Sequence, residues 1–554
     1  MPRRLITFGV DGLDWNLVNV WAAEGRLPVL RDLLSGSHVL IFGESNRPLP
    51  GSIWTDIAAG CSAAVHGFQH EEQLRAGSYQ MERVDSSRVA AAPFYKTLSD
   101  AGIRCAVVDF PIDYPIDGFN GIQVVDWATE FKLWRFETRP KSLAFQLESK
   151  YGRHPLTHYP GTHPDLPGLL ALKHKLTQGI EIKRQFAFDL LQQRQHEFIF
   201  YGFGELHKAG HFFWRFHDRK HPEFTEAEPE LVDSLRAMYE EMDRALGSVL
   251  NQLEPDDDLI VVTDRGMYAD HRGDHLVDAI LLKLGLAVQR ATATVTPATK
   301  SLRSRLLSAR RVTKVYRWVA RRLLSDRLRE ALLPFYRKAI GAVPPWDWTR
   351  TRVFRLPSVG NSYLRVNLAG REPAGVILPG AQYDQLLSDV AAQFRALVNA
   401  ETGEPAVEDV YFPATQFYGP KATELPDVAI VWNSRNRIDA VASEAIGTIS
   451  GRQERERSGN HRPEGFALFR GPSFATGSEV HQGDARQLAP AILRRFGVEV
   501  PRRYEMTAPE AITRSPPSNQ RGADRAQANS ALTPNPVADA PVSQSSDSRR
   551  ASGS

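Results

Sequence analysis

The chain has 554 residues, of which 42% are hydrophobic and 24% charged, and its formal net charge is +3. That length and composition are typical of a globular protein with a large buried core, and they exclude a fully disordered chain. Two cysteines, Cys61 and Cys105, are too few for a disulfide scaffold or a cysteine-based zinc module. The small net charge gives no indication of a specific nucleic-acid partner.

The start of the chain reads as part of the fold. The sequence MPRRLITFGVDGLDW has two arginines and a short β-like run, without the apolar segment and cleavage site of an export signal. No stretch reaches the roughly 18 consecutive apolar residues that a membrane-spanning helix requires. We therefore expect a cytoplasmic protein.

Short β-branched runs alternate with longer helical patterns, which is typical of a mostly parallel sheet with crossover helices. The predicted strands are 5–10, 38–42, 104–110, 197–203, 258–264 and 427–432. The clearest helical patterns lie at 93–101, 165–193 and 228–253. The sequence thus predicts an α/β fold with a mostly parallel sheet flanked by helices.

Two segments depart from this pattern. Residues 300–340 hold thirteen Lys and Arg against two acidic residues, with apolar residues at helical spacing. This basic amphipathic segment is either the solvated face of an inserted cap or a surface for weak contact with anionic membranes. After about residue 514 the chain is rich in Ser, Pro, Ala, Asn and Gln, which predicts disorder. We divide the chain into an α/β core (1–290 and 425–514), an inserted cap (291–424) and a disordered tail (515–554).

Two aspartates directly follow predicted strands, at the end where open α/β sheets place their ligands. Asp11 lies in GVDGLDW, where Gly9 and Gly12 allow close backbone approach. It is either a helix cap or a metal ligand. Asp264 lies in VVTDRGM beside Arg265, which either pairs with it or recognises phosphate or sulfate.

Three histidines could hold a metal ion. His207 and His211, in ELHKAGHFFW, are four residues apart, so on a helix they share one face, as Zn²⁺ or a similar metal requires. This segment is rich in histidine, so the spacing alone is weak evidence for a metal site. Its position directly after a predicted strand strengthens that interpretation. His461, in SGNHRPEG, is either an exposed loop residue or a ligand that completes the site.

Ser52 follows Pro50 and Gly51 and precedes a helical stretch. A hydroxyl at a helix start is either an N-cap or a nucleophile placed where an anion binds. Local sequence favours the N-cap.

Taken in order, these segments resemble the alkaline phosphatase superfamily, and within it the type I phosphodiesterase/nucleotide pyrophosphatase branch. The resemblance covers about 4–290 and 425–505. It is carried by Asp11-Gly12 after the first strand, W-x5-G-x5-HG (Trp54, Gly60, His66, Gly67), GH (Gly210, His211), D-x-GM (Asp264, Gly266, Met267), G-x-H-x3-G (Gly459, His461, Gly465) and D-x5-P-x2-L (Asp484, Pro490, Leu493).

This resemblance implies a doubly wound sheet, two divalent metal ions, often Zn²⁺, and a Ser or Thr nucleophile that attacks phosphorus or sulfur in an ester. We expect a metal-dependent hydrolase of small phosphate esters, phosphodiesterase- or pyrophosphatase-like, with a covalent Ser intermediate. The alternatives are a catalytically silent member that binds an anionic ligand or partner, and a phosphoryl or phosphonate transferase or sulfatase-like enzyme on the same scaffold.

Departures from the family pattern shape the expected metal centre. His207 stands where the family has Asp in D-x2-GH, which implies a three-histidine site of His207, His211 and His461. Arg265 stands where the second metal has a His, so the second site keeps Asp11 and Asp264 or is lost. We expect one or two ions, Zn²⁺ or alternatively Mn²⁺.

The nucleophile position also departs from the family pattern. Counting back from Trp54, that position is Pro50, and Ser52 is the nearest hydroxyl. We therefore expect Ser52 to be the nucleophile and Arg265 to neutralise charge that develops during the reaction.

Overall fold

The computed structural model describes residues 3–84, 86–128, 136–156, 165–290, 346–451, 457–475 and 477–514. The basic segment 300–340 and the tail 515–554 lie outside these residues, so the expectations for both stay predictions. Among the described helices, none is long and apolar enough to cross a membrane.

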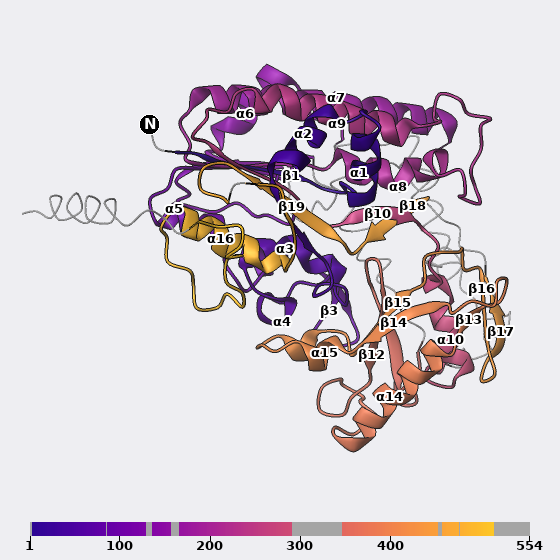
Figure 1. Cartoon of the computed structure of the whole chain (residues 1–554). Helices are drawn as coiled ribbons and strands as arrows, with labels where there is room; N and C mark the ends of the chain where they lie inside the picture. The colour runs from indigo at the N-terminus through magenta and orange to yellow at the C-terminus, as the bar shows by residue number, and fades with distance from the viewer. Residues whose placement is uncertain are drawn as a thin grey trace, which may run out of the picture. The chain divides into compact units, whose positions relative to one another are not determined.

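A nine-stranded sheet forms the centre of the fold (Figure 1). Its strands, in spatial order, are β20 (Val480–Gln482), β2 (His38–Phe42), β19 (Gly465–Arg470), β9 (Asp258–Thr263), β1 (Leu5–Val10), β8 (Phe198–Phe203), β5 (Cys105–Val108), β6 (Gly121–Val125) and β7 (Glu137–Arg139). Parallel pairing runs from β9 through β1, β8 and β5 to β6, whereas β19 is antiparallel to both of its neighbours. The predicted mostly parallel sheet is confirmed.

Helices cover both faces of this sheet, which makes the fold doubly wound (Figure 1). One face carries α1 (Trp15–Ala23), α2 (Pro28–Gly36), α6 (Ser142–Tyr151), α7 (Leu166–Gln193), α8 (Glu205–His217) and α9 (Ser234–Leu250). The other carries α3 (Ile53–Ala59), α5 (Phe94–Asp100) and α16 (Leu488–Arg495). On β8, Ile199 and Tyr201 pack in the first core and Phe198 and Phe200 in the second. A strand buried on both faces is therefore apolar throughout.

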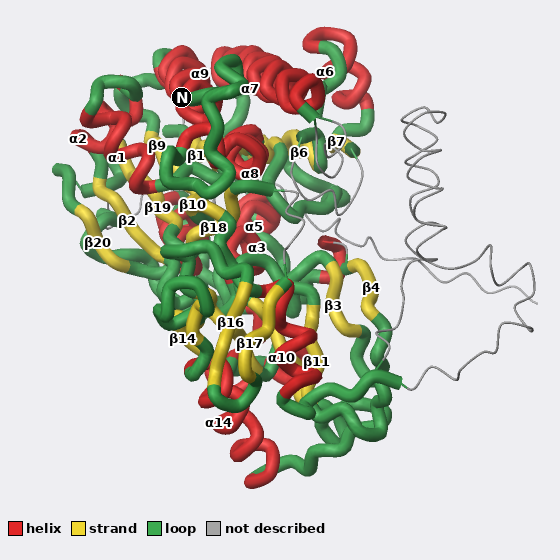
Figure 2. The backbone as a smooth tube through the Cα atoms, turned by 90° about the vertical axis from the view of Figure 1, so that its right-hand side faces the viewer, coloured by secondary structure: helices red, strands yellow, loops and turns green. Residues whose placement is uncertain are grey.

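A second, antiparallel sheet has an apolar core of its own, and Figure 2 shows its backbone apart from the main sheet. It consists of β11 (Val353–Leu356), β12 (Ser362–Val366), β15 (Val428–Trp432) and β14 (Val407–Tyr411), and it packs with α10 (Val277–Lys283) and α14 (Ala381–Arg395). A small sheet of β13 (Val398–Asn399), β16 (Ala440–Ser443) and β17 (Gly447–Ser450) joins the same core.

One predicted strand was placed in the wrong sheet. The run 427–432 forms β15, which pairs with β12 and β14 and not with the main sheet. An apolar run shows that a strand is buried, but it does not identify the strands that pair with it. The second sheet therefore extends past the predicted cap boundary at residue 424.

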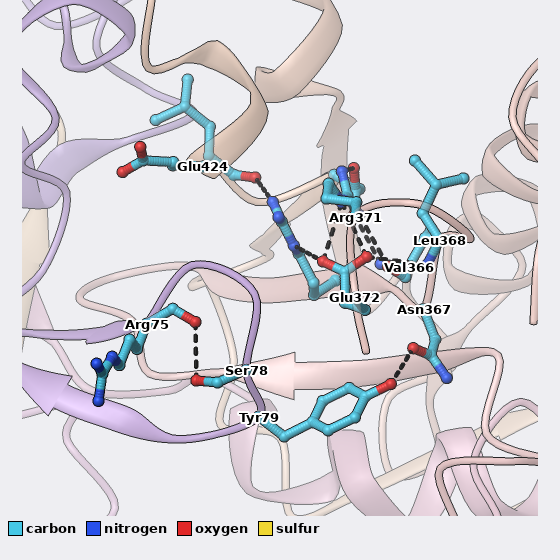
Figure 3. A network of polar contacts seen from close by, with 12 residues as sticks. Arg75, Ser78, Tyr79, Val366, Asn367, Leu368, Arg371, Glu372 and Glu424 are labelled. Carbon is cyan, nitrogen blue, oxygen red and sulfur yellow. Dashed lines mark hydrogen bonds and ion pairs between the residues drawn. The ribbon is translucent and has the colours of Figure 1, made fainter. Parts of the chain in front are cut away.

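A hairpin connects the segment after α3 to this second core. Its strands are β3 (Glu72–Leu74) and β4 (Met81–Arg83), and Figure 3 shows Tyr79, between them, reaching Asn367. Tyr79 Oη donates to Asn367 Oδ1 at 2.6 Å, and its ring stacks on Trp348 with centroids 3.7 Å apart. The region that contains Ser52 is thus anchored to both cores.

Candidate metal centre and active site

The carboxyl ends of three neighbouring strands bring the predicted residues together. Asp11 follows β1, Asp264 follows β9, and His207 and His211 lie on α8, which begins directly after β8. Gly12 has a φ of +79°, and a Cβ atom there would lie 2.6 Å from the Cα atom of His207. Only glycine permits this close approach of the first loop to α8.

His461 reaches the same place through a two-stranded ladder. Strand β18 (Gly459–Arg462) pairs antiparallel with β10 (Gly266–Ala269), and His461 lies opposite Met267. Strand β18 also runs close against α8, since a Cβ atom on Gly459 would lie 2.2 Å from the carbonyl oxygen of Gly210. The glycines of the late motif therefore let His461 join the histidines of α8.

The three histidines form a buried cluster. His207, His211 and His461 each offer one ring nitrogen, and these three atoms all lie within 4.8 Å of one another. The ring centroids are 4.5 to 4.8 Å apart. All three side chains are buried.

Hydrogen bonds fix the ring orientation of two of these histidines. His207 Nδ1 lies 2.7 Å from Asp11 Oδ2, and His211 Nδ1 lies 2.8 Å from the carbonyl oxygen of Gly459. Because both acceptors lack a hydrogen, each Nδ1 donates, and the uncharged form of such a ring has its lone pair on Nε2. The two Nε2 atoms lie 3.0 Å apart. Metal-ligating histidines are held in this way by acceptors on the other ring nitrogen.

The surroundings of His211 and His461 favour neutral imidazoles. Burial, followed by the charge of Arg457, lowers the pKa of His211 well below its ordinary value, and burial followed by Arg265 does the same for His461. Among the described residues, His461 Nδ1 has no hydrogen-bond partner. Neutral imidazole is the form that binds a transition metal.

Arg457 was not predicted. Its Nη1 atom lies 2.9 Å from His211 Nε2, so the guanidinium directly adjoins the cluster. It lies in the charged run QERERSGN, where nothing distinguishes it from the neighbouring arginine.

Asp11, Asp264 and Arg265 form a second, adjoining group. Arg265 Nε lies 2.7 Å from Asp264 Oδ2, and Arg265 Nη1 donates to the carbonyl oxygen of Pro50 at 3.0 Å. The charge and hydrogen bond of His207, with help from Arg265, outweigh burial and hold the pKa of Asp11 well below its usual range. Burial, reinforced by Asp11, raises the pKa of Asp264 well above its ordinary value against the effect of Arg265.

A polar cavity of about 190 Å³ opens beside the cluster. His461, Arg462 and Pro50 line it from the main fold, and Asn361 and Trp432 line it from the second sheet. The cavity gives a small ligand access to His461 between the two cores.

Ser52 lies at the end of a short 3-10 helix, Pro50–Ser52, directly before α3. Its hydroxyl makes no capping bond to α3, contrary to the N-cap interpretation, and lies 3.0 Å from both the Leu49 carbonyl oxygen and Asp56 Oδ2. Asp56 Oδ1 lies 2.6 Å from His66 Nε2. The side chain of Ser52 is buried. The residue of this turn that lines the cavity is Pro50.

Asp56 is the partner of Ser52 that sequence reasoning missed. Burial raises the pKa of Asp56 above its ordinary value, although the hydrogen bond from His66 opposes this. Its position four residues after Ser52, one helical turn away, is a signal that could have identified it.

Residues 5–357 match the model of the type I phosphodiesterase/nucleotide pyrophosphatase family. The chain belongs to this family. Family membership assigns it to the phosphoester hydrolases, and the match contains every predicted site residue except His461. A search of curated proteins found no significant match.

Two solved structures are similar to this chain at low sequence identity. Phosphonoacetate hydrolase from Sinorhizobium meliloti 1021, in complex with phosphonoformate, is 15% identical with a TM-score of 0.46, and the alignment covers 87% of this chain and 91% of that one. An inactive variant of murine ectonucleotide pyrophosphatase/phosphodiesterase 5, in complex with AMP, is 10% identical with a TM-score of 0.43, covering 90% and 96%.

Proposed function

We propose that the protein is a metal-dependent hydrolase of phosphate esters, and of phosphodiesters in particular. The observation that carries this proposal is the convergence of His207, His211 and His461 beside a polar cavity, with two of the rings oriented by acceptors on Nδ1. Membership of the type I phosphodiesterase/nucleotide pyrophosphatase family supports a phosphate ester as the substrate.

The three histidines fit one transition-metal ion. The ring nitrogens are close together and buried, and His461 also lines the cavity, where a substrate could approach. Burial lowers the pKa of His211 and His461, which favours the neutral form that a metal binds. Binding through His211 Nε2 requires Arg457 Nη1, 2.9 Å away, to move aside. Three imidazoles with an open position suit Zn²⁺, with Mn²⁺ as the alternative. When bound, such an ion polarises a phosphoryl oxygen and neutralises its charge.

Ser52 is the proposed nucleophile and Asp56 its proton acceptor. Ser52 Oγ forms a bond to phosphorus, the bond from phosphorus to the leaving alcohol oxygen breaks, and the hydroxyl proton passes to Asp56 Oδ2, 3.0 Å away. Water then attacks phosphorus and the bond from phosphorus to Ser52 Oγ breaks, which releases a phosphate monoester. Ser52 regains its proton from Asp56, and the alkoxide that left takes up the proton that the water loses. Reaching the cavity requires the Ser52 side chain to rotate away from the Leu49 carbonyl.

A second candidate function is binding of an anionic ligand without turnover. The specific observation in its favour is that Pro50, which carries no hydroxyl, lines the cavity while Ser52 is buried against Asp56. Arg462 lines the same cavity and would favour an anion.

Turnover of chromogenic esters distinguishes a hydrolase from a protein that only binds an anion. We expect release of nitrophenol from bis(p-nitrophenyl) phosphate, faster than from p-nitrophenyl phosphate or sulfate, and loss of activity after chelation with recovery on adding Zn²⁺ or Mn²⁺. Saturable binding of phosphate without turnover of any of the three esters would support the silent alternative instead.

A further inference from the structure

Asp11 and Asp264 form a buried pair of carboxyl groups that requires a positive partner. Strands β1 and β9 are adjacent and parallel, with Gly9 opposite Val262, so both aspartates emerge at the same edge. Asp11 is 4% exposed and Asp264 is fully buried. Carboxylates taken out of water together must be neutralised by a cation or a proton.

Arg265 supplies a cation within the chain itself. Its Nε atom contacts Asp264 at 2.7 Å, and its Nη1 atom donates to the Pro50 carbonyl oxygen at 3.0 Å. Arg265 is only 1% exposed, and these contacts hold its guanidinium in place from two sides. An arginine stays charged at all accessible pH values, and it cannot act as a metal ligand.

We propose that Arg265 takes the place of a second metal ion and limits the centre to the single ion at the three histidines. The proposal rests on the proposed function only for the identity of that first site. Oxygen atoms of paired aspartates are good ligands for divalent cations, but a fixed guanidinium repels a second ion. Through Pro50, the same side chain also connects the carboxylate pair to the turn that contains Ser52, which makes Arg265 a positioning residue.

Replacing Arg265 by a ligand should therefore create a metal site. The full chain with His481→Ala serves as background, because His38, Glu479 and His481 form another group whose donor atoms lie within 4.8 Å of one another. Bound zinc is measured by elemental analysis after dialysis against buffered Zn²⁺. We expect one equivalent in the background protein and two after Arg265→His, whose imidazole joins Asp11 and Asp264.

Two further variants are matched controls. Arg265→Lys keeps the charge and should stay at one equivalent. Adding Asp264→Asn to Arg265→His removes a carboxylate ligand and should return the content to one. Thermal melting establishes that each variant is folded.

Two results would overturn the proposal. The first is one equivalent of zinc in both the background protein and a folded Arg265→His variant. The second is two equivalents in the background protein, a result that does not depend on the folding of any variant. If the background protein holds no zinc but Arg265→His gains one equivalent, Arg265 keeps its inferred role and the three-histidine site is refuted. No zinc in either protein refutes both.

Discussion

His207 and His211 face each other through their Nε2 atoms at 3.0 Å, one helical turn apart on α8. The Nδ1 atom of each ring donates to an acceptor from a different part of the chain. The acceptor is Asp11 for His207 and the Gly459 carbonyl oxygen for His211. Asp11, directly after β1, and Gly459, the first residue of β18, thus orient the two rings before any ligand binds, which is the arrangement that a metal site requires.

Asp11→Asn should weaken metal binding without changing the number of ions. The amide loses the negative charge that orients His207 and strengthens it as a ligand, and loss of such a partner typically costs about 10–100-fold in affinity. Competition with a chelating dye measures the dissociation constant. Asp32→Asn, at an exposed position of α2, is the control and should leave the constant unchanged.

Ser52→Ala should lower turnover of a phosphodiester by roughly 10³-fold or more, since the nucleophile is removed. Metal content should stay the same. Thr55→Ala is a matched control, because Thr55 also has a buried hydroxyl at the start of α3, with no hydrogen-bond partner in the described part of the chain. Equal turnover in Ser52→Ala and the wild type would show that another group attacks phosphorus.

His196→Leu should make the protein less sensitive to acid. Burial, followed by the charge of Arg104, lowers the pKa of His196 to about 4. The folded state therefore disfavours the proton that the unfolded state takes up near pH 6.5, and stability is lost as pH falls from 6.5 towards 4.

Urea unfolding at pH 7.5 and pH 4.5 measures this effect. The wild type should lose about 2–3 kcal/mol more between these values than His196→Leu does. His174→Leu, at an exposed position of α7, should behave like the wild type. If His196→Leu loses the same free energy as the wild type, His196 does not titrate as inferred.

The basic segment 300–340 should give weak, salt-sensitive association with anionic membranes. Cations near such a surface contribute up to ~1 kcal/mol each, and the segment holds thirteen of them. Sedimentation with phosphatidylserine vesicles and with neutral vesicles at low salt tests this. If equal amounts of protein sediment with both kinds of vesicle, the interpretation that remains is that the segment is a solvated face of the cap.

The central strands could be predicted because they are buried on both faces and therefore form uninterrupted apolar runs, as β1, β8 and β9 do. The helical patterns at 93–101, 165–193 and 228–253 are confirmed as α5, α7 and α9. Strand β15 has the same apolar character and yet belongs to the second sheet, because pairing depends on residues distant in the sequence.

The candidate site could be predicted where spacing fixes geometry, as for His207 and His211 on one helix face. His461 was proposed from its glycines, and its place depends on the ladder of β10 and β18. The contact of Arg457 with His211 and that of Arg265 with Pro50 could not be predicted, because they join long side chains to atoms far away in the sequence.

The metal content of the purified protein tests the central claim most directly. In the His481→Ala background, which lacks the second group of His38, Glu479 and His481, elemental analysis should find one equivalent of zinc or manganese per chain. Adding His211→Ala should remove most of it, since two imidazoles leave an incomplete set of ligands. His217→Ala, further along the same helix, should keep the full equivalent. Equal metal content with and without His211→Ala in that background, or none in the folded background protein supplied with both metals, would contradict the three-histidine centre.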